Sequence, residues 1–174
     1  MREVIEAAPP LNIFRLMAHA DTAFIPWLRW GGALLSELEL DPVLRELAIL
    51  HVARLTPGAE YEWVQHEAIA IAVGVTAEQV SALERDEPAA DCFSERERGI
   101  LRFVGEVVAG ARVSVGTYAG VASILSPREI VELLMVVGQY MMVGRVMAAL
   151  EIDPDDPLGA TALGAARQAE GLHD

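Results

Sequence analysis

The sequence is poor in cysteine, with a single residue of this type, Cys92, in a chain of 174 residues. One thiol cannot form an internal disulfide bond, so no disulfide framework holds this chain together. A lone thiol is also the usual situation in a reducing compartment. We therefore expect a cytoplasmic protein.

Positive charge is also scarce, since 13 Lys and Arg residues stand against 26 Asp and Glu residues, a net charge of −13 at pH 7. Affinity for nucleic acids comes largely from Lys and Arg side chains that release counterions from phosphates. We therefore expect neither nucleic acid nor an anionic membrane surface as a partner.

Long apolar runs are missing as well. Residues 1–10 carry charges and two prolines where a signal peptide would have its apolar segment. No later stretch approaches the roughly 18 uninterrupted apolar residues that indicate a membrane-spanning helix. We expect neither secretion nor membrane spanning.

What the chain has in quantity is apolar content, 53% of its residues, which is enough to bury the core of one domain. The prediction is a single helical domain over residues 1–158. An Ala-rich tail follows over residues 159–174. Such a tail is expected to fray or to pack on a neighbour.

Signals for helix starts recur along the sequence, and no alternating strand pattern competes with them. Asp41 precedes Pro42 at a predicted first turn, and Thr76, Ser94 and Ser126 each open a capping-box pattern. Gly74 is a candidate left-handed cap. The predicted fold is all-α, with helices over 42–55, 59–73, a short stretch after 76, 94–109, a short segment within 117–125, and 126–150.

Residues 11–38 also carry apolar side chains at helical spacing. Pro26 and the pair Gly31-Gly32 interrupt this stretch. Proline removes a helical hydrogen bond, and glycine weakens a helix interior. We therefore predict two shorter helices here, with the break at these residues.

The helix over residues 59–73 is apolar on two sides. Projection at 100° per residue places Glu62 and His66 one turn apart on one apolar face. The opposite face, which includes Tyr61, Val64 and Ile71, is apolar too. A helix that is apolar on both sides must be buried on both sides. Since one small domain offers a single core, we expect a subunit contact and hence a homo-oligomer.

Two further charged residues project among apolar neighbours. Glu46 falls beside Ile49 and Leu50, and a carboxylate removed from water needs a charged partner, such as His66 or an arginine, or a raised pKa. Arg145 falls on an apolar face near the C-terminus, and arginine can hold a substrate carboxylate. Each feature also has a structural interpretation, because buried Glu and Glu–His pairs often join helices and long Arg side chains often reach the surface.

The run LRELAIL at 44–50, the string YEWVQH at 61–66 and Gly74-Val75-Thr76 resemble the core motif of carboxymuconolactone decarboxylase-like proteins. Looser matches near residues 12–16 and 137–145 extend this resemblance over nearly the whole chain. The resemblance implies an AhpD-like helical bundle that forms a trimer or hexamer. It also implies a protein that needs no metal or organic cofactor.

The peroxidase branch of that superfamily, typified by AhpD, uses a CxxC pair whose second cysteine lies four residues before the motif histidine. Ala59 and Glu62 occupy those two positions in this sequence. Without a thiolate and a resolving thiol, no disulfide can cycle. Peroxidase activity is therefore the least expected function.

The decarboxylase branch implies loss of CO2 from a small organic acid or lactone. The resemblance of this sequence to that branch implies that His66 is the proton shuttle. Either Glu46 or Glu62 would then be the group that orients or charges His66. Arg145 would hold an acid group of the substrate. Tyr61 and Trp63 complete the predicted substrate-binding residues, and no metal ligands are predicted.

Two functions thus stay open. The first is a cofactor-independent lyase or isomerase that works by acid–base chemistry. The second is a non-catalytic ligand-binding or scaffold protein with the same fold, because fold alone does not fix chemistry. The discriminating observation is whether Glu46, Glu62 and His66 converge on a cavity that solvent can reach.

Overall fold

The computed structural model describes residues 11–157, and within this range the chain forms eight helices and no strand. The prediction of an all-α fold is confirmed. The predicted tail over residues 159–174 lies outside the described residues, as do residues 1–10.

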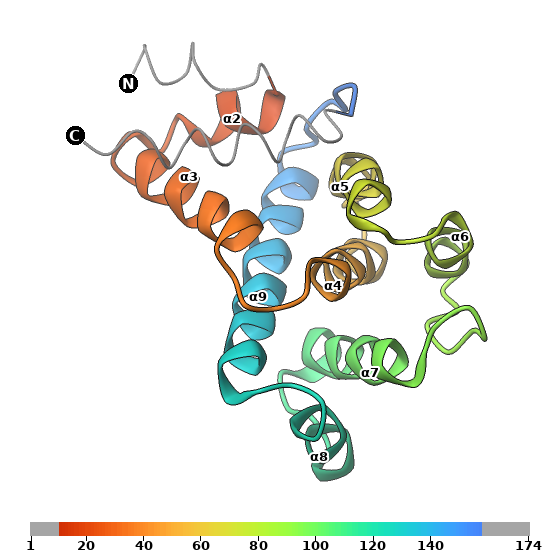
Figure 1. Ribbon diagram of the computed structural model, residues 1–174. Helices are drawn as coiled ribbons and strands as arrows, with labels where there is room; N and C mark the ends of the chain where they lie inside the picture. Colours follow the sequence, from red (N-terminus) through yellow and green to blue (C-terminus); the bar gives the residue numbers. More distant parts are fainter. Residues whose placement is uncertain (1–10, 158–174) are drawn as a thin grey trace.

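One helix, α4 (Pro42–Leu55), forms the centre of the bundle. It packs against α5 (Glu60–Val73), α7 (Glu95–Gly110) and α9 (Pro127–Ala149), which surround it in Figure 1. Every residue of α4 from Leu44 to Ala53 is buried, including its charged ones. This position explains why α4 carries apolar side chains around its whole circumference, as a helix must when it is buried on all sides.

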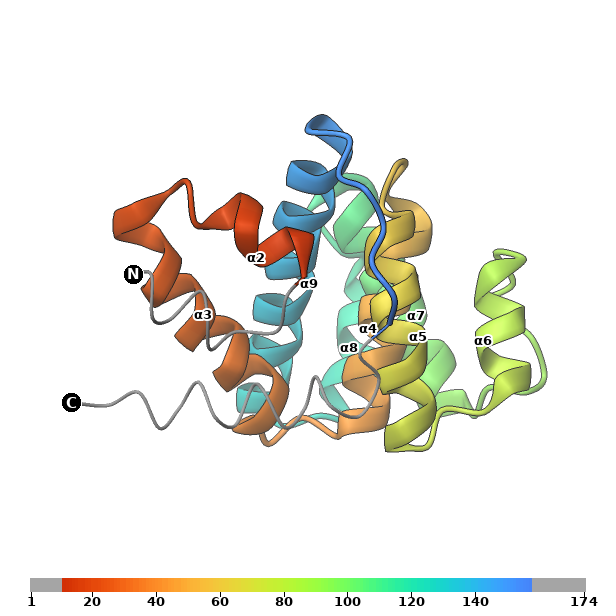
Figure 2. The same ribbon diagram turned by 90° about the horizontal axis from the view of Figure 1, so that it is seen from above.

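The remaining helices flank this centre. The helices α2 (Asn12–Met17) and α3 (Asp21–Ser36) lie on the α9 side of the molecule, whereas α6 (Ala77–Glu84) lies at the opposite end, beyond α5 (Figure 2). The short α8 (Val115–Ala122) packs on α7 and α9.

The helix starts follow the capping chemistry that the sequence predicts. The Asp41 side chain accepts hydrogen bonds from the backbone of Val43 and Leu44 at the start of α4. Complete capping boxes begin α6, α7 and α9 at Thr76, Ser94 and Ser126. These side chains satisfy backbone N–H groups that a helix start leaves without a partner, so the local sequence alone fixes these boundaries.

The predicted break at Pro26 and Gly31-Gly32 is wrong. The helix α3 continues through all three residues, and the break between the two N-terminal helices falls at residues 18–20 instead. The cost of a proline or glycine inside a helix, about 1 to 3 kcal/mol each, is offset by tertiary packing. Phe24 and Leu34 of α3 are almost fully buried, and such burial stabilises the continuous helix.

The helix α9 serves as a second core element. By length and composition it could cross a membrane, but half of its most apolar stretch is buried inside the protein. Leu133, Val136 and Val137 have no exposed surface and join the core cluster that α4, α7 and α8 also form. This is the situation of a core helix.

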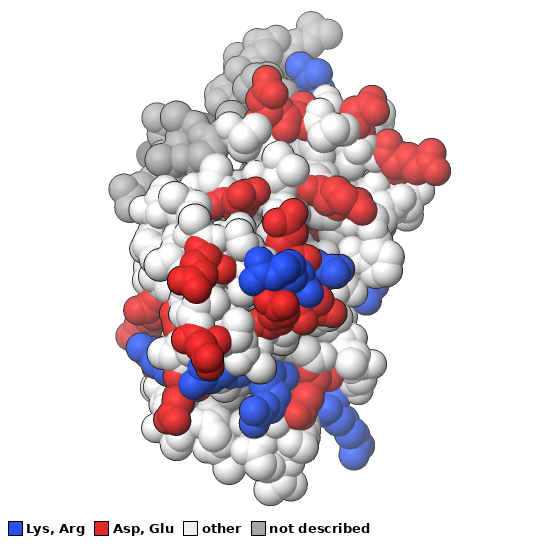
Figure 3. All heavy atoms as spheres, turned by 90° about the vertical axis from the view of Figure 1, so that its right-hand side faces the viewer, with Lys and Arg blue, Asp and Glu red and all other residues white. Residues whose placement is uncertain are grey.

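The surface carries the excess of negative charge that the composition predicts. Figure 3 shows the face on the side of α6, where red carboxylate groups outnumber blue arginine groups and the two kinds are interspersed. Arg85 pairs with Glu87 and Arg128 pairs with Glu39, and all four side chains are exposed. Exposed pairs of this kind contribute little to stability. Arg128 also pairs with the buried carboxylate of Glu132.

Candidate functional site

Two of the predicted site residues meet where α4 and α5 pack together. Nδ1 of His66 on α5 lies 2.8 Å from Oε2 of Glu46 on α4. The Glu46 side chain has no exposed surface, and the His66 side chain keeps 10% of its surface exposed. Glu46 is therefore the carboxylate that partners the histidine.

The second oxygen of Glu46 faces an arginine, one of the two kinds of partner that the sequence predicted, although the sequence did not identify which arginine. Nε of Arg45 donates to Oε1 of Glu46 at 2.9 Å, and Nη1 of Arg45 donates to the carbonyl of Leu35 at 2.8 Å. Each carboxylate oxygen thus faces one nitrogen, which compensates the cost of placing a charge in the core. Helix periodicity could not reveal this pair, because adjacent residues on a helix point about 100° apart.

The ring of His66 is held on a second side by Tyr140 of α9. The two rings meet edge to face, with centroids 4.7 Å apart and an angle of 85° between the planes. Since Nδ1 faces an acceptor, Nδ1 carries a proton and Nε2 is the nitrogen left for a ligand or for solvent. The combination of Glu46 and Tyr140 therefore fixes both the tautomer and the orientation of the ring.

Glu62 lies one turn before His66 on α5 and has different surroundings. Its side chain is buried, with 1% of the residue exposed, and within the described residues neither carboxylate oxygen has a hydrogen-bond partner. Burial raises the pKa of Glu62 well above its usual range. Glu62 is therefore not the group that charges His66.

Tyr140 also lies near both glutamates. Burial raises the pKa of the Tyr140 phenol, and the nearby carboxylates of Glu46 and Glu62 raise it further. The phenol therefore stays neutral beside both acids. In the sequence, Tyr140 falls only within the loose family match near the C-terminal end, so its position beside His66 was not predicted.

Tyr61 and Trp63, the other predicted residues of α5, point elsewhere. The hydroxyl of Tyr61 donates to Oδ2 of Asp155 at 2.5 Å, and its ring packs with Val143 and Met147. Trp63 is half-buried against a separate apolar cluster that involves α4 and α6. Neither residue joins the pair of His66 and Glu46.

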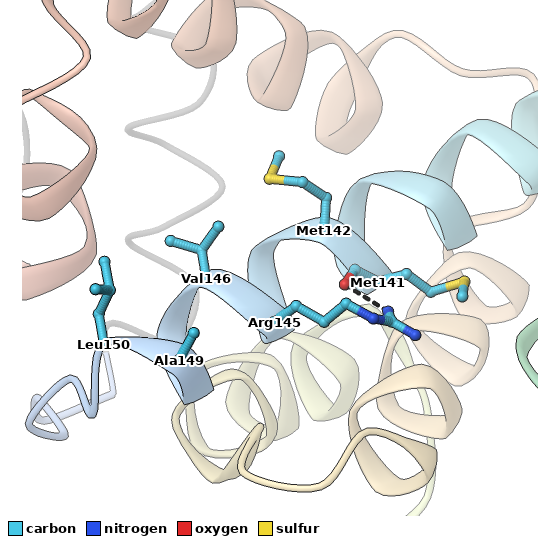
Figure 4. Close-up of a pocket in the computed structure, with 6 residues that line it drawn as sticks. All are labelled: Met141, Met142, Arg145, Val146, Ala149 and Leu150. Atoms are coloured by element: carbon cyan, nitrogen blue, oxygen red, sulfur yellow. Dashed lines mark hydrogen bonds between the residues drawn. The ribbon is translucent and has the colours of Figure 1, made fainter.

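Arg145 lies apart from this pair as well. Its side chain is exposed, and Nη1 donates to the carbonyl of Met141 at 2.7 Å. Figure 4 shows it extended along α9 at the edge of an open groove of about 570 Å³. The other residues that line this groove are all apolar: Met141, Met142, Val146, Ala149 and Leu150.

The described residues form neither a metal site nor a site that joins Cys92 to His66. Among residues 11–157, no three His, Cys, Asp or Glu side chains are grouped as ligands of a metal ion. Cys92 packs against the apolar cluster around α6, where its Sγ lies 4.0 Å from the carbonyl of Glu78. The one thiol therefore belongs to a different part of the molecule from His66.

Comparison with known proteins places this geometry in context. Residues 23–106, which include Glu46, Glu62 and His66, match the model of the carboxymuconolactone decarboxylase family. No curated protein matches the sequence.

Several solved structures share the fold, including two peroxidase-related proteins. One is an uncharacterized peroxidase-related protein from Silicibacter sp. TM1040, with 19% identity and a TM-score of 0.73 over 82% of this chain and 75% of that chain. The other is described as an alkylhydroperoxidase AhpD core, an uncharacterized peroxidase-related protein from Ralstonia eutropha JMP134. It has 18% identity and a TM-score of 0.74 over 83% of this chain and 77% of that chain. The fold is therefore AhpD-like.

Proposed function

We propose that this chain is a member of the carboxymuconolactone decarboxylase and AhpD-like superfamily and that it is a cofactor-independent lyase or isomerase acting on a small organic acid or lactone. The observation that carries this proposal is the buried series Arg45, Glu46 and His66. A carboxylate that holds the Nδ1 side of a histidine sets its tautomer and stabilises the imidazolium when the ring takes up a proton.

The proposed chemistry is proton transfer. When CO2 leaves an unsaturated acid, the electron pair of the broken carbon–carbon bond spreads into a conjugated carbonyl, and the carbon then accepts a proton. His66 is the most exposed member of the series, with 10% of its side-chain surface exposed against 4% for Arg45 and none for Glu46. In this proposal His66 exchanges protons with solvent, while Glu46 and Arg45 compensate its charge. An isomerase would use the same proton transfers without loss of CO2.

Peroxide reduction is not part of the proposal, although both structural neighbours carry the word peroxidase in their descriptions. Ala59 and Glu62 stand where the AhpD-type cysteine pair would stand. The single thiol, Cys92, lies in another cluster, and a dithiol cycle needs two sulfur atoms. The shared fold does not transfer the redox chemistry.

The experiment that tests the proposal compares the wild-type protein with His66→Gln on a panel of small organic acids and lactones. Mass spectrometry would follow loss of the mass of CO2 or isomerisation of each compound. We expect His66→Gln to slow turnover by about 100-fold or more, because a positioned acid–base group typically contributes that much. Glu67→Gln, one residue further on the exposed side of α5, is the matched control. Full activity in His66→Gln would contradict the assignment.

A non-catalytic ligand-binding role is the second candidate, and the nearly closed site favours it. His66 keeps 10% of its side-chain surface exposed, and Glu62 is buried more deeply still. A binding protein would show compounds that raise its thermal midpoint without being consumed. The same panel therefore separates the two functions, because an enzyme both binds and converts its compound.

A further inference from the structure

The carboxyl group of Glu62 lies in the same site but makes no hydrogen bond to Arg45, Glu46 or His66. Both of its oxygens are buried and lack hydrogen-bond partners among the described residues. Buried polar groups in native proteins nearly always have a partner, so an orphaned carboxyl group needs an explanation. A charged carboxylate in this position would be strongly unfavourable.

The surroundings of Glu62 are apolar and closely packed. A Cβ atom at Gly144 of α9 would lie only 3.0 Å from Oε2 of Glu62, 3.3 Å from Cβ of Ala59 and 3.4 Å from the methyl group of Thr56. Gly144 therefore leaves the space that the carboxyl group occupies, and any larger residue would displace it. The hydroxyl of Thr56 is buried nearby and also lacks a partner among the described residues.

Glu62 and Glu46 are thus the same type of residue in opposite environments. Glu46 faces Arg45 from its own helix and His66 from α5. Among the described residues Glu62 has no hydrogen-bond partner, and a titratable neighbour on α9 is the phenol of Tyr140. An apolar environment without a cation favours the protonated form of a carboxyl group, which is the form that a proton donor needs.

The spacing along α5 places this acid beside the histidine. Residues four apart on a helix share a face, with Cβ atoms about 6 Å apart, so the carboxyl group of Glu62 and the ring of His66 lie on the same side of α5. Tyr140 and Gly144 repeat the same spacing on the facing helix, α9. The two pairs face each other across the contact of α5 and α9.

We propose that Glu62 is the proton donor of this site, held as a neutral carboxylic acid until it gives its proton to the bound compound. This assignment rests on the proposed function and deepens it. As CO2 leaves, the electron pair of the broken bond forms a new C–H bond with the proton of Glu62, whose own O–H bond breaks. The resulting carboxylate then recovers a proton that His66 passes on from solvent.

The first test needs no substrate, since it detects the neutral carboxyl group directly. Infrared spectra at neutral pH would compare the wild-type protein with Glu62→Gln and Glu46→Gln in the C=O stretching region of protonated carboxylic acids. We expect a band in the wild-type protein that disappears in Glu62→Gln and persists in Glu46→Gln. Absence of the band from the wild-type protein, or its persistence in Glu62→Gln, would overturn the proposal.

A second measurement, the thermal midpoint of unfolding, tests whether the carboxyl group of Glu62 serves the site or stabilises the fold. Glu62→Met replaces the orphaned group with a flexible apolar side chain, and we expect the thermal midpoint to rise by a few degrees, about 2 to 6 °C. Glu46→Gln, which leaves Arg45 and His66 without their anion, should lower the midpoint. A lower midpoint in Glu62→Met would overturn the proposal.

The outcome for Glu62 is separable from that for the proposed function. An infrared band without turnover of any compound would establish the neutral acid and contradict the proposed lyase or isomerase activity. Turnover that depends on His66, in a protein without the infrared band, would support the lyase or isomerase activity and contradict the role of Glu62 as proton donor.

Discussion

At the scale of single residues, partners rather than burial decide what an ionisable group can do. Glu46 and Glu62 are both almost completely buried, yet Glu46 has two nitrogen partners and Glu62 has none among the described residues. The sequence predicted that both would point inward, because helix periodicity shows which side of a helix is apolar. It left Glu46 and Glu62 as alternative partners of His66, because the packing of α4 against α5 decides between them.

His51 of α4 provides a prediction about pH at this scale. Burial lowers the pKa of His51 from 6.5 to about 4, and Asp86 opposes this effect. The unfolded chain therefore binds one more proton than the folded protein between these values, so stability falls as the pH falls from about 6.5 to about 4. The loss should reach about 3 kcal/mol, since each pKa unit corresponds to about 1.4 kcal/mol.

Urea unfolding of the wild-type protein and His51→Leu across this pH range would measure that loss. The variant should lose less stability on acidification, because it carries no proton acceptor at this position. His19→Leu, at an exposed position, is the control and should follow the wild-type profile. Parallel profiles for the wild-type protein and His51→Leu would show that His51 does not titrate in this way.

At the scale of helices, the sequence predicts helix starts that depend on local hydrogen bonds. It does not predict features that depend on contacts between helices. The capping boxes at Thr76, Ser94 and Ser126 fix three helix starts through bonds within one turn. The continuity of α3 through Pro26 depends on packing against other helices, which no local signal contains. Tyr140 was missed for the same reason, since its contact with His66 joins α9 to α5.

The C-terminal segment, residues 151–157, is an element that the sequence analysis treated as a simple end of α9. It runs back along α5 (Figure 2), where Asp155 accepts hydrogen bonds from the hydroxyl of Tyr61 and the backbone of Asn12. Gln65 donates to the backbone carbonyls of Asp155 and Asp156. The segment therefore ties α2 and α5 together next to the turn that carries Glu62 and His66.

Replacement of Asp155 tests this role. Asp155→Ala removes both bonds, so we expect faster hydrogen exchange in α2 and in residues 151–157, with no change in α7. Hydrogen–deuterium exchange mass spectrometry would measure it. The control is Asp156→Ala, because the side chain of Asp156 makes neither bond. Equal exchange in the wild-type protein and Asp155→Ala would show that Asp155 does not hold the segment in place.

At the scale of the whole molecule, apolar surface remains uncovered on two helices. The opposite face of α5 exposes Val64 and Ile71, and α9 exposes Val131, Leu134 and Met135. Exposed apolar side chains that gather on one side of a helix commonly mark a contact with another protein. We propose that a second copy of this chain covers it, in agreement with the homo-oligomer that the sequence predicts.

Light scattering coupled to size-exclusion chromatography would determine the mass in solution. We expect the wild-type protein to be an oligomer, a trimer or hexamer by its family resemblance, and Leu134→Glu to dissociate it, because a charge cannot be buried there without a partner. Arg96→Glu on the exposed side of α7 should leave the mass unchanged. A monomeric wild-type protein at all concentrations would contradict the proposal.

We infer that Glu46 holds His66 so that Nε2 is the nitrogen that exchanges protons. The ¹⁵N chemical shifts of the His66 ring, measured where the ring is neutral, report directly which nitrogen carries the proton. We expect the proton on Nδ1 in the wild-type protein and a mixture of the two tautomers in Glu46→Gln. A proton on Nε2 in the wild-type protein would contradict this role of Glu46.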